Sequence, residues 1–219
     1  MGKWGYFITF EGIEGSGKST LARELYEYLK ANCFRVLMTR EPGGTKEAEE
    51  IRQVLLKTGN NLDPVTELLL MLAARRENVY KKILPALRQT YIVISDRFDD
   101  SSFAYQGFGR GLELKFISRL NKVATGGLKP NLTFLVDIEP EYGFSRKNSQ
   151  ELDRIEQEDL EFHTRVRRGY LILARRAKKR IRVLDGKKSV DELKEEVIDW
   201  TLKRLEEKGI KKFKIMEEC

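Results

Sequence analysis

The sequence contains few of the residues on which zinc-binding or disulfide-stabilised proteins depend. Of its 219 residues, two are cysteines, one is a histidine and five are prolines. Cys33 and Cys219 have neither the spacing of a metal site nor that of a disulfide framework. We recognise no N-terminal signal segment and no apolar run of about 18 residues, so we expect neither secretion nor membrane insertion. We therefore expect a cytoplasmic protein.

Charge, by contrast, is abundant and mainly positive. Charged residues make up 34% of the chain, and the formal net charge at pH 7 is +7. Two interpretations stay open: a basic surface that binds nucleic acid, or arginines that line a pocket for several phosphates. Much of the positive charge lies in residues 165–168, 175–182 and 208–214, where it alternates with other residues at helical spacing. This pattern favours solvated helix faces, and we expect His163 in the same region to be exposed.

Short apolar segments alternate with longer amphipathic ones. The apolar segments predict strands at Tyr6–Glu11, Arg35–Thr39, Tyr91–Ser95, Leu132–Asp137 and Ile181–Asp185. The amphipathic segments predict helices at Ser19–Ala31, Lys46–Leu56, Pro64–Leu87, Leu112–Thr125, Asp159–Lys178 and Ser189–Lys208. Strands separated by helices of this length pair in parallel, and their nearly continuous apolar character indicates a sheet covered on both faces. We expect one α/β domain over residues 1–219, with a five-stranded parallel sheet flanked by helices.

Residues 12–19 lie between the first predicted strand and the first predicted helix. They match the phosphate-binding loop G-x-x-x-x-G-K-[ST] in the context that this motif requires. The glycines let successive backbone N–H groups face one anion, and the helix adds its positive end. We expect Lys18 to reach the β- and γ-phosphates of ATP and Ser19 to hold Mg²⁺. The residues expected at ATP are Gly12, Ile13, Glu14, Gly15, Ser16, Gly17, Lys18, Ser19 and Thr20.

Asp96 and Arg97 stand at the carboxyl end of the third predicted strand. In a parallel sheet this end of a strand borders the nucleotide crevice, so Asp96 can orient Mg²⁺ and Arg97 can bind a second phosphate group. No Asn-Lys-x-Asp motif, which reads guanine in GTPases, follows any predicted strand. A monophosphate acceptor is already ionised at neutral pH and needs no general base, whereas a hydroxyl acceptor needs one.

At this level of detail the chain resembles the thymidylate kinases, which transfer phosphate from ATP to dTMP. The resemblance lies in FEGIEGSGKST (10–20), TREPGGT (39–45), EEIR (49–52), AAR (73–75), DRFDDSSFAYQGFGR (96–110) and LDRIEQEDLEF (152–162). The block at residues 96–110 is much more specific than the phosphate loop. The resemblance implies a P-loop kinase fold, ATP and dTMP as substrates, Mg²⁺ as cofactor, a homodimer, and no nucleic-acid or membrane partner.

The resemblance also implies roles for individual residues. Arg97 would bind the phosphate of dTMP and stabilise charge during transfer, and Arg52 would lie near that phosphate. Arg75 would hydrogen-bond the thymine edge, Tyr105 would lie against the deoxyribose, and Glu14 would approach the 3′-hydroxyl. The full set implied at dTMP is Glu14, Arg52, Met71, Arg75, Arg97, Ser102, Tyr105 and Gln106.

A mobile lid at about residues 142–158 is a further implied feature, whose arginines would close over ATP. Gly15 stands where some relatives place an arginine in the phosphate loop. The resemblance is therefore to the subgroup that supplies this cation from the lid, which makes Arg154 the first candidate and Arg146 the second. The expected catalytic residues are Lys18, Arg97 and Arg154, and the expected metal ligands are Ser19 and Asp96.

One departure from the family concerns the base. Met71 occupies the position of a phenylalanine that usually stacks on thymine, although a thioether can also contact an aromatic face favourably. Two alternatives stay open. The chain could be a deoxynucleoside kinase with Glu41 as the base for a sugar hydroxyl, or a non-catalytic module that uses ATP as a switch or binds nucleic acid.

Overall fold

The computed structural model describes residues 4–146 and 152–212. Its five strands form one parallel sheet in the order β2-β3-β1-β4-β5. The predicted sheet is confirmed. The bounds of β1, β4 and β5 agree with the prediction, and β2 and β3 each start and end one residue later. The strands are β1 (Tyr6–Glu11), β2 (Val36–Arg40), β3 (Ile92–Asp96), β4 (Leu132–Asp137) and β5 (Ile181–Asp185).

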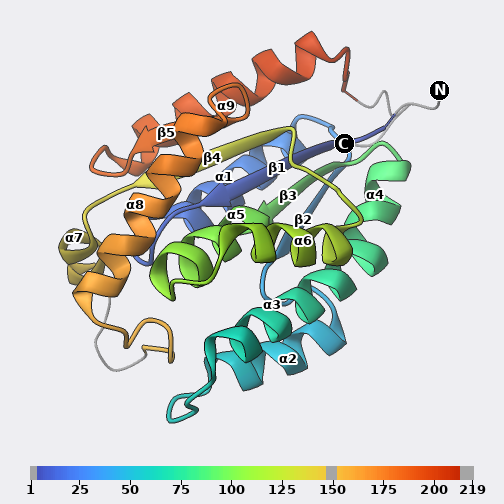
Figure 1. The fold of residues 1–219 in the computed structure, drawn as a ribbon. Coiled ribbons are helices and arrows are strands. Elements are labelled where there is room, and N and C mark those ends of the chain that lie inside the picture. Colours follow the sequence, from blue (N-terminus) through green and yellow to red (C-terminus); the bar gives the residue numbers. More distant parts are fainter. Residues whose placement is uncertain (1–3, 147–151, 213–219) are drawn as a thin grey trace.

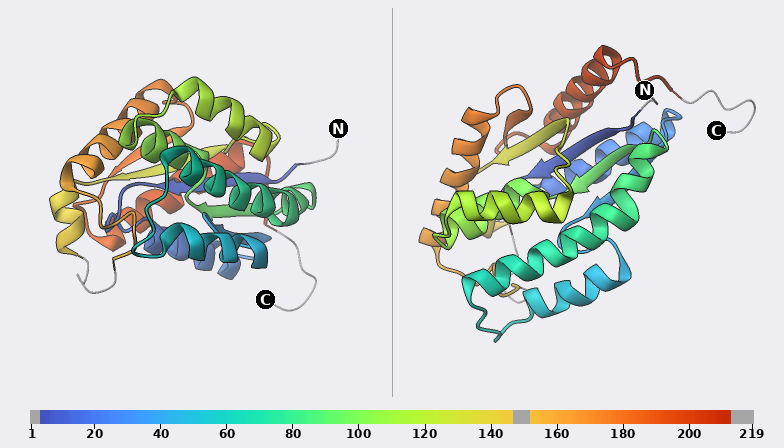
Figure 2. Two further views of the ribbon diagram at one scale, coloured as in Figure 1. Left: turned by 60° about the horizontal axis from the view of Figure 1, so that its bottom comes forward. Right: turned by 45° about the vertical axis from the view of Figure 1, so that its right-hand side comes forward.

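Helices cover both faces of the sheet (Figure 1), and Figure 2 shows the same layers from two further directions. On one face, α1 (Lys18–Ala31) packs beside α9 (Val190–Glu207). The other face is covered mainly by α4 (Leu84–Arg88) and α8 (Leu160–Arg176), with α3 (Pro64–Asn78) and α6 (Leu114–Thr125) packed against each other beside them. The remaining helices are α2 (Lys46–Leu56), α5 (Asp99–Ser102) and α7 (Pro140–Ser145).

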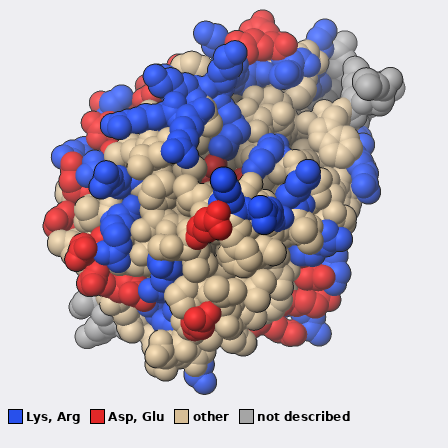
Figure 3. Space-filling view, viewed as in Figure 1, with Lys and Arg blue, Asp and Glu red and all other residues tan. Residues whose placement is uncertain are grey.

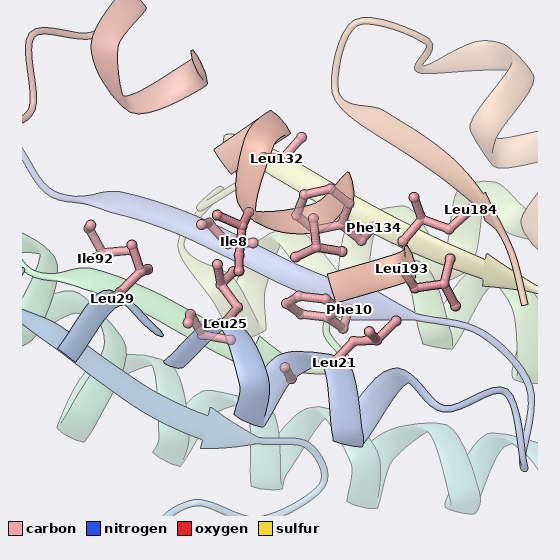
Figure 4. Close-up of a cluster of buried hydrophobic side chains, with 14 of the residues drawn as sticks. Ile8, Phe10, Leu21, Leu25, Leu29, Ile92, Leu132, Phe134, Leu184 and Leu193 are labelled. Carbon is pink, nitrogen blue, oxygen red and sulfur yellow. The ribbon is translucent and has the colours of Figure 1, made fainter. Parts of the chain in front are cut away.

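The largest apolar core lies between the sheet and the α1–α9 layer (Figure 4). Ile8 and Phe10 point to the same face of β1 because side chains alternate along a strand. Leu21 and Leu25, one turn apart on α1, meet them, and Leu193 of α9 closes the layer. Burying one such side chain contributes about 1.5–3 kcal/mol. This packing fixes the start of α1 beneath β1, and thereby the loop between them.

Two π-helical turns interrupt the opposite layer. Val79–Ile83 joins α3 to α4, where a single helix over Pro64–Leu87 was expected. Phe103–Gly109 follows α5 and was not expected to be helical at all. Its Gly109 is required by a close contact, since a Cβ there would lie 2.6 Å from the Phe162 ring of α8. Helical periodicity cannot predict this segment, because packing against a distant helix holds it.

The carboxyl ends of all five strands lie at one edge of the sheet, since all neighbours are parallel. Because β1 lies between β3 and β4, the loop that follows β1 is adjacent to Asp96 and Arg97 at the end of β3. Within the described residues, no helix combines the length and apolar character needed to cross a membrane. Part of the predicted lid (147–151), the end of the basic tail and Cys219 lie outside those residues.

Candidate active site

The loop at residues 12–19 has the geometry of an anion-binding turn. Gly12, Gly15 and Gly17 have φ angles of 145°, 70° and 90°, which side-chain-bearing residues rarely adopt. A Cβ on Gly12 would lie 2.6 Å from the carbonyl oxygen of Val136, so a glycine is also required there by space. Lys18 is 8% exposed, and its Nζ donates to the carbonyl oxygen of Ile13 at 3.2 Å. The lysine ammonium is therefore held within the curve of the loop.

Ser19 and Asp96 meet beside this loop. Ser19 Oγ donates to Asp96 Oδ2 at 2.5 Å. Asp96 Oδ1 is buried and accepts no hydrogen bond from any residue in the described ranges. A hydroxyl and an unpaired carboxylate oxygen are the hard ligands that Mg²⁺ prefers, so the pair fits the predicted metal site. Mg²⁺ commonly binds to one or two protein oxygens together with substrate phosphates and waters, so two protein ligands are enough for such a site.

Arg97 connects the phosphate loop to the predicted acceptor side. Its Nη1 donates to the carbonyl oxygen of Gly12 at 2.9 Å, and its Nη2 donates to Glu14 Oε1 at 2.7 Å. The Tyr105 hydroxyl donates to the same Glu14 oxygen at 2.6 Å. Arg97 also donates to the hydroxyls of Tyr105 and Tyr170, both at 3.1 Å. A cation and an anion predicted to contact dTMP are thus already adjacent.

Both members of this pair are charged at neutral pH. Burial acts to raise the pKa of the Glu14 carboxyl, but the Arg97 charge and contacts with His163 and Lys18 hold that pKa well below its usual range. Burial acts to lower the pKa of Arg97, but Tyr105, Tyr170 and Glu14 raise it well above its ordinary value. An ionised Glu14 can only accept hydrogen bonds, as an interaction with a sugar hydroxyl requires.

The expectation that His163 is exposed is wrong, because its side chain is fully buried. Its Nδ1 lies 3.4 Å from Glu14 Oε2, and its ring is edge-on to Phe144 at 4.8 Å between centroids. His163, Val166 and Tyr170 are spaced by three and four residues on α8, so they share the face that packs on the sheet. This spacing is the signal that its charged neighbours obscured.

A cavity of about 580 Å³ opens in front of the loop, within the range of small-molecule sites. It brings together most of the predicted residues from both sets. Gly12, Ile13 and Ser16 belong to the loop but do not line the cavity. Those that line it are Glu14, Gly15, Gly17, Lys18, Ser19, Thr20, Arg52, Met71, Arg75, Asp96, Arg97, Ser102, Tyr105, Gln106 and Arg146.

Positive charge predominates in the cavity wall. The cationic side chains are Lys18, Arg23, Arg40, Arg52, Arg75, Arg97 and Arg146, and the acidic ones are Glu14, Glu41, Asp96, Asp153 and Glu156. This excess of cations suits a ligand with several phosphates. None of the basic residues at 165–182 lines this cavity. On the surface, Lys and Arg gather instead over the upper part of the face in Figure 3, near β5 and α9.

The two candidate lid arginines differ in position. Arg146 lines the cavity, and its Nη2 donates to the Tyr142 hydroxyl at 2.9 Å. Arg154 does not line it: its Nη2 donates to Glu67 Oε2 at 2.7 Å, and its Nε donates to the carbonyl oxygen of Leu55 at 2.9 Å. The structure therefore does not bring Arg154 together with the other expected catalytic residues, Lys18 and Arg97.

The absence of a side chain at Gly15 has a structural cause. A Cβ on Gly15 would lie 2.0 Å from the carbonyl oxygen of Gly143 in α7, and a Cβ on Gly143 would lie 2.5 Å from the carbonyl oxygen of Glu14. The helix that leads into the predicted lid therefore rests directly on the phosphate loop. An arginine at position 15 would not fit this arrangement.

Arg75 lines the cavity and is 2% exposed. Its Nε donates to Glu41 Oε2 at 2.6 Å, and its Nη1 donates to Ser102 Oγ at 2.7 Å and Asn121 Oδ1 at 2.6 Å. Its Nη2 donates to the carbonyl oxygen of Phe98 at 2.9 Å. These contacts fix the guanidinium plane rigidly. They also engage Glu41, the base that a nucleoside kinase would require.

Sequence reasoning missed Glu11, a buried glutamic acid at the end of β1. Its Oε1 accepts a hydrogen bond from the backbone N–H of Phe98 at 2.8 Å. Its Oε2 accepts from Ser101 Oγ at 2.6 Å and from the Tyr170 hydroxyl at 3.0 Å. Glu11 thereby ties the residue after Arg97 to α8. An acid that ends an otherwise apolar central strand was the available signal.

Comparison with known proteins agrees with this geometry. A family model described as thymidylate kinase matches residues 10–197. The thymidylate kinase of Kosmotoga olearia is 47% identical over 193 residues, 88% of this chain and 93% of that protein. That of Symbiobacterium thermophilum is 46% identical over 192 residues, 87% of this chain and 90% of that protein. A crystal structure of thymidylate kinase from Ehrlichia chaffeensis matches with a TM-score of 0.76 at 37% identity, covering 91% of this chain and 99% of that one. The chain therefore belongs to the thymidylate kinase family.

Proposed function

We propose that this protein is an ATP-dependent dTMP kinase, which transfers the γ-phosphate of ATP to dTMP and yields dTDP and ADP. The observation that carries the proposal is one cavity that contains both Lys18 of the phosphate loop and the arginines Arg97 and Arg75. The cavity can therefore hold the phosphates of a donor and of an acceptor next to each other, with cationic side chains beside both. Membership of the thymidylate kinase family supports the same reaction.

At the donor end, the loop N–H groups and Lys18 bind the β- and γ-phosphates of ATP. Ser19 and Asp96 would hold Mg²⁺, which would supply charge neutralisation at these phosphates. Support for this assignment comes from the short Ser19–Asp96 contact and the unpaired Asp96 oxygen. Arg146 lies in the cavity wall, where it can close over ATP as a lid residue.

At the acceptor end, Arg97 binds the phosphate of dTMP and stabilises the charge that develops during transfer. Arg52, whose Nη1 donates to the carbonyl oxygen of Pro42, lies near the same phosphate. Ionised Glu14 accepts a hydrogen bond from the 3′-hydroxyl, and Tyr105 lies against the deoxyribose. Ser102, Met71, Arg75 and Gln106 surround thymine.

The chemistry requires positioning more than covalent participation. The dTMP phosphate is the nucleophile and is already ionised, so no general base is needed. A sugar hydroxyl would need Glu41 as its base, but the Glu41 carboxylate already accepts a hydrogen bond from Arg75 at 2.6 Å. This contact favours a monophosphate acceptor. Arg154 stays a candidate for catalysis, but it would first have to leave Glu67.

We also propose a cytoplasmic homodimer. Family membership supports both statements. Exposed apolar side chains support the dimer: Leu69 of α3 is 50% exposed and Val123 of α6 is 70% exposed. Large apolar side chains exposed on packed neighbouring helices are typical of an interface between subunits.

A coupled ADP-release assay with ATP and Mg²⁺ tests the function directly. The acceptors are dTMP, dUMP, dCMP, UMP and thymidine. We expect clear preference for dTMP. Activity on thymidine instead would assign the chain to nucleoside kinases with Glu41 as the base. ATP binding without transfer to any acceptor would favour a non-catalytic switch.

A further inference from the structure

Glu67 is a fully buried carboxylate on α3, one helical turn before Met71 in the cavity wall. Three side chains donate to it. Gln106 Nε2 donates to Oε1 at 2.8 Å, Arg110 Nη2 donates to Oε2 at 3.0 Å, and Arg154 Nη2 donates to Oε2 at 2.7 Å. Glu67 itself does not line the cavity, so it has no part in the reaction described above.

Glu67 is ionised despite its burial. Burial acts to raise its pKa, but hydrogen bonds from Arg110, Gln106 and Arg154 and the charge of Arg110 lower it below its ordinary value. An ionised carboxylate can only accept hydrogen bonds. The amino group of the Gln106 amide must therefore face Glu67, since its oxygen would be repelled there.

The position of the Gln106 amino group also determines where the amide oxygen, Oε1, lies. Gln106 is 1% exposed and is one of the residues that line the cavity, so a ligand in the cavity can reach its amide. Its Oε1 accepts no hydrogen bond from any residue in the ranges 4–146 and 152–212. One of the two Nε2 hydrogens is engaged by Glu67, and the amide oxygen is left as the acceptor that Gln106 offers to a ligand.

We propose that Glu67 is a positioning residue that sets base selectivity by fixing the orientation of the Gln106 amide. Held in this way, Gln106 Oε1 accepts a hydrogen bond from N3–H of thymine. Cytosine has no hydrogen on N3, so its N3 lone pair would face the Gln106 oxygen. The repulsion between these two atoms disfavours binding of a cytosine nucleotide. The inference rests on the proposed function, in which Gln106 faces the base of dTMP.

A flip of the Gln106 amide, which exchanges its nitrogen and oxygen, would remove the selectivity, and Glu67 opposes this flip. The flip would replace a charge-assisted hydrogen bond by a contact between two oxygens in a buried place. Arg110 and Arg154 contribute indirectly, because their charges keep Glu67 ionised. Base recognition is thereby connected to Arg154 at the predicted lid.

The substitution Glu67→Gln tests this inference. It keeps the size of the side chain, but an amide at position 67 can donate to Gln106 Oε1 and so permits both orientations. The measurement is kcat/KM of the full chain for dTMP and for 5-methyl-dCMP, which differs from dTMP only at N3 and position 4 of the ring. We expect the ratio of the two values to fall by about tenfold, the effect of one hydrogen bond to a mispaired group. This ratio does not depend on the fraction of folded enzyme.

Glu158→Gln is the matched control. Glu158 Oε1 lies 2.7 Å from Arg110 Nη1, so it belongs to the same charge cluster but does not contact Gln106. We expect its selectivity ratio to equal that of the wild type. If Glu67→Gln alone does not fold, the double variant Glu67→Gln/Arg110→Gln removes one anion and one cation together, and we expect the same fall in the ratio.

The outcomes separate the two proposals. A wild-type protein that shows no preference for dTMP over 5-methyl-dCMP contradicts the proposed base recognition itself. A wild-type preference that persists unchanged in the Glu67 variants overturns only the role of Glu67. An equal fall in Glu158→Gln would also overturn it, because the effect would then belong to the charge of the cluster and not to the amide.

Discussion

Arg97 combines an unusual backbone conformation with many side-chain contacts. Its φ of 69° lies in the left-handed region, which costs a non-glycine residue about 1–2 kcal/mol. Its backbone N–H donates to the carbonyl oxygen of Phe10 at 2.9 Å, which ties the turn to β1. The turn directs the guanidinium across the end of β1 toward Glu14. Strain at this residue thus accompanies its placement between the two substrate ends.

We expect Arg97→Ala to lower kcat with dTMP by about 10²–10³, because a positioned cation for the transferring phosphate is lost. Affinity for a non-hydrolysable ATP analogue should stay near that of the wild type, since Lys18 and the loop remain. Steady-state kinetics and analogue titration measure the two effects. Arg165→Ala, at an exposed arginine outside the cavity, is the control. Near-normal turnover of Arg97→Ala would contradict its assigned role.

Met71→Phe should leave turnover intact and lower the KM for dTMP, by up to about tenfold, because an aromatic ring stacks on a base better than a thioether does. Met71 is partly buried and lines the cavity one turn before Arg75, so a larger side chain there meets the ligand. Initial rates at varied dTMP measure the change. Met71→Ala should weaken binding instead. Severe loss of affinity in Met71→Phe would mean that the base lies elsewhere.

Glu11 predicts a pH dependence of stability. Burial and the neighbouring Asp100 raise the pKa of its carboxyl to about 8. Above an unfolded-state pKa near 4.3, the unfolded chain releases this proton while the folded protein keeps it. The contribution of Glu11 to stability is therefore fully present below about pH 4.3 and is lost as the pH rises toward 8.

Glu11→Gln should remove this loss, because an amide resembles the protonated acid and does not titrate. We expect the decline in melting temperature between pH 5 and pH 8 to be smaller in the variant than in the wild type. Thermal unfolding at several pH values measures it. Glu27→Gln, at an exposed position of α1, should follow the wild type. An identical decline in all three proteins would mean that Glu11 is ionised in the folded state.

At the scale of elements, the contact between α7 and the phosphate loop links donor binding to the lid. Gly143 is buried and approaches the carbonyl oxygen of Glu14 so closely that a Cβ would lie 2.5 Å from it. A methyl group at Gly143 would therefore separate α7 from the loop. Arg146, which follows α7, would move with it.

Gly143→Ala should raise the KM for ATP and lower kcat, whereas the KM for dTMP should change less. Kinetics with each substrate varied in turn separate these effects. Ser145→Ala lies in the same helix on an exposed side and should behave as the wild type. Unchanged ATP parameters in Gly143→Ala would show that α7 can shift without affecting the donor site.

The sequence predicted elements where one local pattern determines the structure. Strand Tyr6–Glu11 and helix Lys46–Leu56 have the predicted bounds, because continuous apolar runs and amphipathic spacing each indicate one solution. The π-helical turn Val79–Ile83 was not predictable in this way, since it depends on how α3 and α4 each pack. A single extra residue in that turn changes which face α4 presents after α3.

The residues of the site likewise fall into those that a local sequence pattern predicts and those that it does not. Contiguous motifs and the family resemblance located the residues that line the cavity, including Lys18, Asp96 and Arg97. His163 was placed wrongly, and Glu67 was missed. Both are buried polar side chains whose partners lie far along the chain, Glu14 and Gln106 respectively. Such pairings arise only when helices dock, so spacing within one segment does not indicate them.

At the scale of the whole molecule, one surface carries apolar side chains that the single chain leaves uncovered. Leu69 and Arg76 are seven residues apart and so share one face of α3. Arg76 Nη1 donates to the carbonyl oxygen of Val123 at 2.8 Å, and its guanidinium lies over the Tyr80 ring at 3.6 Å. Tyr80 and Val123 therefore lie on either side of Arg76, and Leu69 lies two turns away on the same face of α3; we call these residues together the α3–α6 surface.

Val123→Glu should convert a dimer into a monomer, because a carboxylate added to the α3–α6 surface would lose its hydration when the subunits associate. Sedimentation velocity of the wild type and the variant measures the change. Val190→Glu is the matched control, since Val190 is exposed on α9, away from this surface. A monomeric wild type, or a Val123→Glu variant that remains dimeric, would contradict a dimer through these helices.

The strand order has a consequence for biosynthesis. Strand β1 precedes β3 and β4 in the sequence, and these are the two strands with which it pairs in the described sheet; β4 begins at Leu132. Pairings so distant in sequence form slowly, and a chain emerging from the ribosome presents its segments in order. Residues 12–19 are therefore synthesised long before β4, and their loop lacks its permanent neighbours until β4 has left the ribosome. The nucleotide site is thus completed long after its phosphate loop has been synthesised.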